Sequence, residues 1–487
     1  IEDGVLKISD CGIEENSPFD YSVHIQAALK TAAANPGTVL EFENGTYNVS
    51  YGSDDTKHLF DLSNMAGADL HINGNGATLL MNDNFAGCFN LQGLENVTIE
   101  NLNFDLVENP FVQATVTAYD TETMVMSIEL DSDNDLLDDT RMFDRVSTRY
   151  GMVRDKDNPY LMKEECVNYF KFDAWEKTGD RQYTVELSAA TKHFTNKYIE
   201  AGDKVILNNR GDHTTFIFNA VNTGNVTLKD INIYNSAGGG LVARQNTGDI
   251  LLQNFNMKIK EGSTNWICGN ADAVHVQGCK GKVEIKDCEF TALSDDAVNL
   301  YQWYGDVREV LSDNQMIIKH TGTNYAVGDK VKIVEGATST IVAHLEIAEI
   351  EVLDVVSERL KITFTENIGL DVGEYKDTYH VYSDAYSFVG SSITNSTFTN
   401  IRGRALFLHS IDVTVEGNTF TNISNHGIEG WYQGGEGFNV EDLKINNNTF
   451  TNVSYLYGEA NGSASGTIVF HTNAGTAQAT NIVHDNI

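Results

Sequence analysis

Short runs of alternating apolar and polar residues recur along the chain, and six of them share one pattern. In each run, apolar positions alternate with polar ones, a bend residue follows that is usually Asn or Asp, and a second short alternation completes the pattern. The six runs begin at Val97, Val226, Ile250, Val283, Val413 and Leu443. A period of two predicts β-strands, and Asn or Asp accepts the left-handed backbone of a tight bend and can stack with its neighbours.

The spacing of the runs indicates how these strands are arranged. Val226 and Ile250 are 24 residues apart, and Ile250 and Val283 are 33 residues apart. Such intervals fit the coils of a parallel β-solenoid whose loops vary in length. The 4 prolines of the whole chain agree with long, uninterrupted β-ladders. We therefore expect an all-β fold, a right-handed parallel β-helix in which Val226, Ile250 and Val283 stack in one sheet.

The pattern disappears twice, over residues 108–210 and 301–385. Both stretches contain longer runs of alternating apolar and polar residues. Each also contains a similar sequence motif near its end, Ala201-Gly202-Asp203-Lys204-Val205-Ile206 in the first and Val327-Gly328-Asp329-Lys330-Val331-Lys332-Ile333 in the second. The shared motif predicts two related small antiparallel β-barrel modules, each inserted in a loop of the solenoid. Because the second begins at Tyr301, directly after the strand that follows Asp295 and Asp296, we expect it to form one wall of a cleft.

Five segments follow from this division. They are an N-terminal cap with the first coils (1–107), inserted module 1 (108–210), central coils (211–300), inserted module 2 (301–385) and C-terminal coils (386–487). In the first segment, residues Ser22 to Ala34 have helical apolar spacing and are followed by Asn35-Pro36-Gly37. A short amphipathic helix there suits a cap that protects the open edge of the first coil.

Composition and charge narrow the class of protein. The chain of 487 residues is 41% hydrophobic and 21% charged, which excludes general disorder, and no apolar run approaches the roughly 18 residues of a membrane span. Its 69 acidic and 33 basic side chains give a net charge of −36, which argues against a nucleic-acid partner. The start at Ile1-Glu2-Asp3 is what we expect of a mature bacterial protein, secreted or periplasmic, whose signal peptide has been removed.

Six cysteines are too few for a scaffold built on disulfides, and none forms a Cys-x-x-Cys zinc pair. We expect Cys279 and Cys288, which fall among the stacked coils, to be buried free thiols. No cofactor and no metal are expected.

The candidate catalytic residues lie in two similar sequence motifs, Asn270-Ala271-Asp272-Ala273-Val274 and Ser294-Asp295-Asp296-Ala297-Val298. Their Asp-Ala-Val triplets are 24 residues apart, so stacking places Asp272 beside Asp296, roughly 4.8 Å away, and His275 beside Asn299. Because side chains alternate along a strand, Asp272 and Asp296 point one way and Asp295 the other. Asp is also a common turn residue, but repetition at coil spacing beside inward valines favours a chemical role.

Two carboxyl groups suffice for glycoside hydrolysis, one as acid and one as base. The stacked pair, Asp272 and Asp296, can hold one water, whereas Asp295 projects elsewhere and suits the general acid. Two anionic neighbours should raise the pKa of Asp295 and keep it protonated.

Several neighbouring residues could contact a sugar, and each has an ordinary structural alternative. Aromatic rings that could stack on a sugar or pack in a core are Tyr301, Trp303, Tyr304, Trp431 and Tyr432. Arg402 and Arg404 could bind hydroxyls, a sulfate or a carboxylate, or could neutralise the aspartates. His275 and Asn299 are ladder or binding residues, and Glu429 and Glu436 near Trp431 bind hydroxyls or lie in a solvated loop.

These aspartates, the flanking repeats and the coil Arg402-Gly403-Arg404 resemble glycoside hydrolase family 110, the exo-acting inverting α-1,3-galactosidases. The resemblance covers nearly the whole chain, including the two β-barrel inserts. It implies Asp295 as general acid and Asp272 with Asp296 as general base, acting on a terminal α-galactosyl group of a glycan or an algal galactan oligosaccharide.

Other functions stay open at this point. Polygalacturonases of family 28 and α-1,3-glucanases of family 87 share the three-aspartate pattern, although the Gly-His-Gly and Arg-x-Lys signatures of family 28 do not follow the aspartates here. A metal-dependent lyase would need a Lys or Arg base; the basic residues between Asp272 and Asp296 are Lys280, Lys282 and Lys286. A non-catalytic adhesin-like solenoid would bind carbohydrate without turnover. The expected partner is a carbohydrate, with a homo-oligomer as an alternative and with neither nucleic acid nor membrane.

Overall fold

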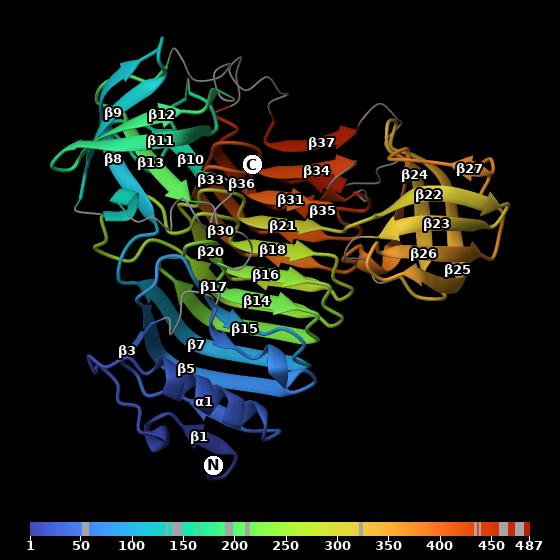
Figure 1. Cartoon of the computed structure of the whole chain (residues 1–487), viewed down its shortest axis with the longest axis horizontal. Coiled ribbons are helices and arrows are strands. Elements are labelled where there is room, and N and C mark those ends of the chain that lie inside the picture. Colours follow the sequence, from blue (N-terminus) through green and yellow to red (C-terminus); the bar gives the residue numbers. More distant parts are fainter. Residues whose placement is uncertain are drawn as a thin grey trace.

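Two long parallel sheets form most of the molecule, which we describe from a computed structural model. The structure describes residues 1–50, 58–132, 135–138, 149–164, 166–189, 198–209, 215–320, 325–432, 436–437, 440–456, 466–472 and 482–487. The chain passes alternately through the two sheets, so successive coils stack from the N-terminus at one end to the C-terminal coils at the other (Figure 1). The prediction of a nearly all-β chain with a parallel β-solenoid is therefore confirmed.

In the described chain, the larger sheet, sheet A, contains 16 strands. They are β1 (Val5–Lys7), β2 (Val39–Glu41), β3 (Thr46–Val49), β5 (Asp69–Met81), β7 (Asn96–Leu106), β15 (Asn225–Ile233), β17 (Ile250–Met257), β19 (Val283–Lys286), β20 (Glu289–Thr291), β29 (Ser392–Thr394), β30 (Thr397–Ile401), β32 (Thr414–Glu416), β33 (Thr419–Ile423), β35 (Lys444–Asn446), β36 (Thr449–Val453) and β38 (Ile482–His484). Val226 pairs with Ile250, and Ile250 pairs with Val283. The three residues thus stack in one sheet, as the repeat predicted.

The second sheet, sheet B, contains 9 strands among the residues described. They are β4 (His58–Asp61), β6 (Gly87–Asn90), β14 (Phe218–Val221), β16 (Leu241–Arg244), β18 (Val274–Gln277), β21 (Val298–Tyr301), β31 (Leu406–Leu408), β34 (Ile428–Tyr432) and β37 (Ile468–Thr472). One continuous apolar core fills the space between the sheets, and it includes stacked rings such as Phe398, Phe420 and Phe450. Cys279 and Cys288 lie in this core as free thiols, as expected.

The bend residue of each repeat has the backbone conformation that the pattern predicted. The φ angle is positive at Asn101, Asp230, Asn254, Asp287, Gly417 and Asn447, one in each of the six runs. Polar side chains next to these bends also bond from coil to coil: Asn232 donates to Asn103 at 2.9 Å, and Asn256 donates to Asn232 at 3.1 Å. These ladders hold successive coils in register.

A helix covers the start of the solenoid. Helix α1 (Ser22–Ala33) buries Ile25, Ala28, Leu29, Ala32 and Ala33, and it packs against β2, β4 and β5. The helix predicted from the apolar spacing is therefore present. No helix among the described residues is long and apolar enough to cross a membrane.

The first interruption of the repeat contains six antiparallel strands that pair in a closed barrel. They are β8 (Phe111–Asp120), β9 (Val125–Leu130), β10 (Arg149–Arg154), β11 (Phe170–Gly179), β12 (Gln182–Leu187) and β13 (Lys204–Asn209). The chain leaves sheet A after β7 and returns to sheet B at β14. This module, which we call insert 1, therefore replaces a corner of the solenoid at which the chain passes from sheet A to sheet B.

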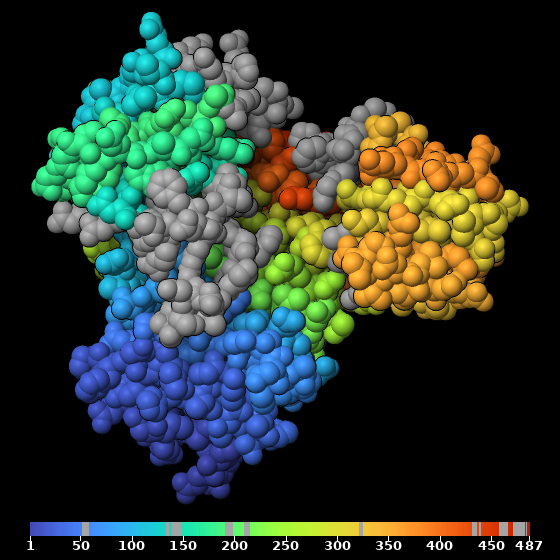
Figure 2. All heavy atoms as spheres, viewed as in Figure 1, coloured from blue at the N-terminus to red at the C-terminus, as the bar shows by residue number. Residues whose placement is uncertain are grey.

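The second interruption contains a sheet of seven antiparallel strands within the described residues, and β23 also pairs with β22. The strands are β22 (Gly305–Ser312), β23 (Gln315–His320), β24 (Lys330–Glu335), β25 (Thr340–Asp354), β26 (Arg359–Phe364), β27 (Gly373–Glu374) and β28 (Tyr379–Ser383). This module, insert 2, follows β21 of sheet B and precedes β29 of sheet A. It therefore leaves from the opposite kind of corner, and Figure 2 shows the two inserts as lobes on different sides of the solenoid.

Candidate active site

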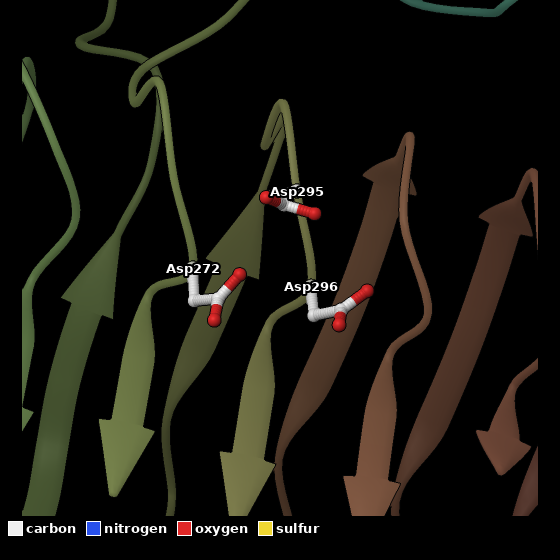
Figure 3. Close-up of side chains that lie close together, drawn as sticks. All are labelled: Asp272, Asp295 and Asp296. Atoms are coloured by element: carbon white, nitrogen blue, oxygen red, sulfur yellow. The ribbon is translucent and has the colours of Figure 1, made fainter. Parts of the chain in front are cut away.

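The stacking of β18 on β21 brings the three aspartates together. Val274 pairs with Val298 and His275 with Asn299, and the Ala273 amide donates to the Asp296 carbonyl oxygen at 3.1 Å. Asp272 and Asp296 stand at the starts of adjacent strands with their carboxylates pointing the same way, while Asp295 lies one residue earlier and points differently (Figure 3). The 24-residue register is thus confirmed, whereas Asp295 does not point away from the pair, because one oxygen of each carboxylate lies within 4.8 Å of the other two.

All three carboxylates are buried, and one oxygen from each lies within 4.8 Å of the other two. Three anions this close would repel one another strongly without compensating charge. Arginines supply that charge beside Asp295 and Asp296, and a hydrogen-bonding histidine holds Asp272.

Asp295 is held by an arginine from the next coil. Arg402 Nη2 lies 2.6 Å from Asp295 Oδ1, its Nε donates to the Ser294 carbonyl oxygen, and its Nη1 donates to Asn168 Oδ1 at 3.3 Å. The guanidinium of Arg402 thus places a positive charge beside Asp295, and our expectation for this residue considered only its two anionic neighbours.

Asp296 is held by the second arginine of the same coil. Its Oδ1 accepts from the Arg404 backbone amide at 2.7 Å, and its Oδ2 lies 2.7 Å from Arg404 Nη2. Arg404 also donates to Glu429 Oε2 at 3.2 Å and lies 3.7 Å from the ring centre of Phe407. Burial lowers the pKa of Arg404, but the coulombic effects of Asp296 and Glu429 outweigh it and raise that pKa above its ordinary value.

Asp296 is the carboxyl group of the cluster whose pKa is raised. Burial raises the pKa of Asp296 to about 7, Arg404 opposes the rise, and the charges of Asp295 and Asp272 add to it. A carboxyl group that titrates near neutral pH can exchange a proton during a reaction. The carboxyl group with the raised pKa is thus Asp296, one of the stacked pair.

Asp272 is held by a chain of hydrogen bonds on its own side. His275 Nδ1 lies 2.6 Å from Asp272 Oδ2, and His275 Nε2 lies 3.2 Å from the Tyr301 hydroxyl. Burial, with a contribution from Glu436, raises the pKa of Tyr301 and keeps it a neutral phenol. Its hydroxyl can therefore donate to Nε2 while the Nδ1 proton faces Asp272, which fixes the ring and the carboxylate in one orientation.

A close approach between coils makes these contacts geometrically possible. A Cβ atom at Gly403 would lie 2.4 Å from Asp296 Oδ1 and 2.6 Å from the Asp295 carbonyl carbon. Only glycine therefore lets the Arg402-Gly403-Arg404 coil come near enough for both guanidinium groups to reach the aspartates.

A pocket of about 210 Å³ opens over two of the three aspartates. Its solenoid side is formed by Asn270, Ser294, Asp295, Asp296, Arg402, Gly403, Arg404 and Asn425, and its other side by Tyr150, Met152, Asn168, Tyr169 and Asn208. The second group lies in the segment of insert 1. Tyr150 and Tyr169 meet edge to face, with ring centres 5.0 Å apart.

The expectation that insert 2 forms a wall of this cleft is wrong, because insert 1 occupies that place. The aspartates lie where the chain passes from sheet A to sheet B, which is the corner that insert 1 extends on an earlier coil. Insert 2 starts beyond the far end of β21, and the 4 residues of that strand span roughly 13 Å. The module that follows Asp296 most closely in sequence is therefore not the one that lines the pocket.

The remaining predicted residues are distributed around the site. Asn299 is buried beside His275, and Glu429 is buried against Arg404. Trp303 is half-buried and does not line the pocket, Tyr304 packs against His380 and Tyr382 of insert 2, and Glu436 is exposed. The side chains of Trp431 and Tyr432 lie outside the described residues.

The pocket residues of insert 1 were not found from the sequence. Tyr150, Met152 and Asn208 sit in strands whose pattern differs little from that of any barrel strand, and they are more than 60 residues from the aspartates in sequence. The position of the insert at a corner between the same two sheets was the one available signal.

Three carboxylate oxygens could in principle hold a cation. Here Arg402, Arg404 and His275 each occupy a position beside one of the three carboxylates. This arrangement suits acid–base chemistry better than the binding of a further cation.

Comparison with known proteins adds an independent observation. An α-1,3-galactosidase A of Bacteroides thetaiotaomicron is 25% identical over 434 residues, which cover 86% of this chain and 74% of that protein. The chain resembles bacterial α-1,3-galactosidases. An α-1,3-galactosidase A of Shewanella woodyi is 24% identical over 92% of this chain and 76% of its own length. The resemblance expected from the aspartates and the repeat is thereby confirmed.

No protein-family model matches the chain. Among solved structures, the catalytic unit of a GH87 α-1,3-glucanase from Streptomyces thermodiastaticus strain HF3-3 aligns with a TM-score of 0.36 and 11% identity, over 93% of this chain and 47% of that one.

Proposed function

We propose that the protein is a secreted glycoside hydrolase that removes terminal α-1,3-linked galactose from glycans or galactan oligosaccharides. The observation that carries the proposal is a cluster of three buried carboxylates at a pocket, each held by a different basic residue, in a chain similar to α-1,3-galactosidases over most of its length. The same cluster would suit related β-helix hydrolases, and the relatives favour the galactoside.

The size of the pocket supports action at a chain end. At about 210 Å³, it is smaller than the roughly 300 Å³ at which pockets for larger ligands begin. One sugar ring fits such a space better than the middle of a polysaccharide does. We therefore propose exo-acting hydrolysis, with the terminal sugar between the aspartates and insert 1.

For the chemistry, we propose Asp295 as general acid and Asp272 with Asp296 as general base. The stacked pair can orient one water through two parallel carboxylates, and the side chain of Asp295, which also lines the pocket, has a different orientation (Figure 3). Arg402 stabilises the carboxylate of Asp295 after it has given its proton to the leaving oxygen. The His275–Tyr301 chain holds Asp272, and Arg404 holds Asp296.

One observation favours exchanging two of these roles. The pKa of Asp296 is raised to about 7, mainly by burial, so Asp296 could carry the proton for the leaving group. Substrates that need no acid separate the two assignments, because only the variant of the true acid regains activity on them.

We propose inversion at the anomeric carbon. The carboxylate oxygens lie within 4.8 Å, whereas acid and base usually stand roughly 6.5–9.5 Å apart in inverting enzymes and about 5–5.5 Å apart in retaining ones. The spacing by itself favours retention, while the resemblance to family 110 favours inversion. NMR of the first product decides: a β-galactose product supports inversion, and α-galactose excludes it.

The first experiment is a screen against α-1,3-, α-1,4- and α-1,6-linked galactosides, with polygalacturonate and α-1,3-glucan as alternatives. We expect release of galactose from the α-1,3 linkage. Unsaturated products that absorb in the ultraviolet would indicate a lyase, for which Arg402 and Arg404 are the candidate bases in the pocket. Binding of the galactoside without release of galactose would indicate a non-catalytic solenoid.

Four of the five segments of the chain take separate places in this proposal, and segment 1–107 forms the N-terminal cap with the first coils. The central coils 211–300 carry the aspartates, the C-terminal coils 386–487 supply the arginines, and insert 1 (108–210), as a barrel module, supplies the opposite side of the pocket. Insert 2 (301–385) is a second barrel module outside the pocket.

A further inference from the structure

One face of two strands in insert 1 lies against the solenoid beside the pocket. In β13, Val205 and Leu207 point into the barrel interior, whereas Ile206 packs with Met152 of β10 and with Trp266 and Ile267 of the solenoid. Side chains alternate along a strand, so Asn208 shares the face of Ile206. Its partner across the ladder is Tyr150, which also lines the pocket.

Asn208 is an unusual residue for this face. It is 2% exposed, and its side-chain oxygen Oδ1 is buried with no hydrogen-bond partner among the described residues. Its backbone lies between Tyr150 on one side and Phe111 on the other, so the strand cannot easily shift to provide a partner. Burying an unpaired amide oxygen costs free energy, and an apolar residue would continue the adjoining cluster better.

Ser294 presents a similar group from the solenoid side. It is 4% exposed, and its Oγ is also buried without a partner in the described part of the chain. Its backbone is fixed, because its amide donates to the Gly269 carbonyl oxygen at 3.2 Å and its carbonyl accepts from Arg402. Asn208 and Ser294, each with one buried and unpartnered polar atom among the described residues, thus both line the pocket that contains Asp295 and Asp296.

We infer that Asn208 and Ser294 are the residues that recognise hydroxyl groups of the terminal sugar. The Asn208 carbonyl oxygen can only accept, so it selects a free hydroxyl and disfavours a sulfate or carboxylate at that position. The Ser294 hydroxyl pairs with a second group of the sugar. The inference rests on the proposed function for the identity of the sugar, and it assigns part of the specificity to insert 1.

The test compares two variants of Asn208 with a matched control. Asn208→Leu and Asn208→Ala remove the acceptor with and without filling its volume. Asn219→Leu is the control, because Asn219 in β14 is also buried, at 5% exposed, with an unpartnered Oδ1, but does not line the pocket. Thermal unfolding by circular dichroism establishes that each variant is folded, and either Asn208 variant suffices if the other is not.

The readout is kcat/KM on an α-galactoside and on its 2-, 3-, 4- and 6-deoxy analogues. We expect both Asn208 variants to lose at least about tenfold on the parent and to lose nothing further when one particular hydroxyl is absent. Ser294→Ala should show the same behaviour with a different hydroxyl. Equal losses on all the analogues, no loss at all, or the same loss in Asn219→Leu would overturn the inference.

Direct binding separates this inference from the proposed function. If the protein hydrolyses no α-galactoside, the proposed function fails, and NMR titration with free galactose and glucose then tests Asn208 by itself. Binding that weakens at least fivefold in the Asn208 variants and not in Asn219→Leu supports the inference. The absence of sugar binding in the unaltered protein, or unchanged binding in the variants, overturns it.

Discussion

At the scale of single residues, the main feature of the site is the set of contacts that hold three neighbouring carboxylates. Three buried carboxylates share a small volume: Arg402 and Arg404 bring positive charge to Asp295 and Asp296, and His275 forms a hydrogen bond with Asp272. Removing one partner of a buried pair leaves an uncompensated charge, so these residues act on both stability and reactivity. Two predictions belong to this scale.

The first concerns the roles of the aspartates. Asp272→Asn, Asp295→Asn and Asp296→Asn should each lower turnover by at least about 10²-fold, the scale of lost acid–base catalysis. The variant of the general acid should recover most on an aryl galactoside with a good leaving group, because that substrate needs no proton. We expect this recovery in Asp295→Asn. Recovery in Asp296→Asn instead would exchange their roles, and equal losses on both substrates would contradict the division of roles.

The second concerns the pH dependence of stability. Asp296 has a pKa of about 7 in the folded protein against an ordinary value of 3.8. The folded state therefore binds the proton more tightly than the unfolded state does, and this contribution to stability is lost as pH rises from about 4 through 7. In Asp296→Asn that loss is absent. Urea unfolding of both proteins between pH 4 and 8 should show the unaltered protein losing a few kcal/mol relative to the variant. Parallel pH profiles would refute this prediction, and Asp412→Asn, at an exposed ion pair with Lys444, is the control.

At the scale of elements, the coil is the unit that positions chemistry. Its bends contain residues with a positive φ angle, and its ladders fix the pairing of the strands residue by residue. Asp272 and Asp296 therefore align on neighbouring coils. Neighbouring coils also approach each other closely at Gly403, where the arginine coil meets the aspartates.

Gly403→Ala tests that spacing. The added Cβ would lie 2.4 Å from Asp296 Oδ1, so the coil must move away and both arginines must lose their contacts with the aspartates. A displacement near 1 Å can cost about 10²-fold in turnover, and we expect a kcat loss of that order with the β-helix intact by circular dichroism. Gly373→Ala is the control, because a Cβ there has no atom within 4 Å. A fully active Gly403→Ala enzyme would show that the close approach is not needed.

At the scale of the whole molecule, the two inserts have different relations to the pocket. Insert 1 extends a corner from sheet A to sheet B, where the aspartates also lie, and insert 2 extends a corner from sheet B to sheet A. Each has its own apolar core, so their shared sequence motif reflects similar local folds rather than similar roles.

A pair of matched tyrosine variants tests this difference. Tyr150 meets Tyr169 edge to face at 5.0 Å in the pocket wall, and Tyr375 meets Tyr379 edge to face at 5.4 Å in insert 2. Tyr150→Ala should raise KM roughly tenfold, since an aromatic contact is worth about 0.5–1.5 kcal/mol. Tyr375→Ala should leave KM within about twofold. Steady-state kinetics on the same galactoside gives both values, and a larger effect at Tyr375 would place the substrate beside insert 2.

The sequence by itself determined the features that depend on local periodicity. The alternation around Val226, Ile250 and Val283 requires strands, and its recurrence sets the stacking, because neighbouring parallel strands pair residue by residue. The same register placed Asp272 beside Asp296 and His275 beside Asn299. Only the tertiary structure decided which groups from distant segments complete the site. Arg402 reaches Asp295 across 107 residues, and Asn208 reaches the pocket from a barrel whose placement depends on the corner it leaves. Burial, which raises the pKa of Asp296, is likewise a property of the assembled coils and not of any local pattern.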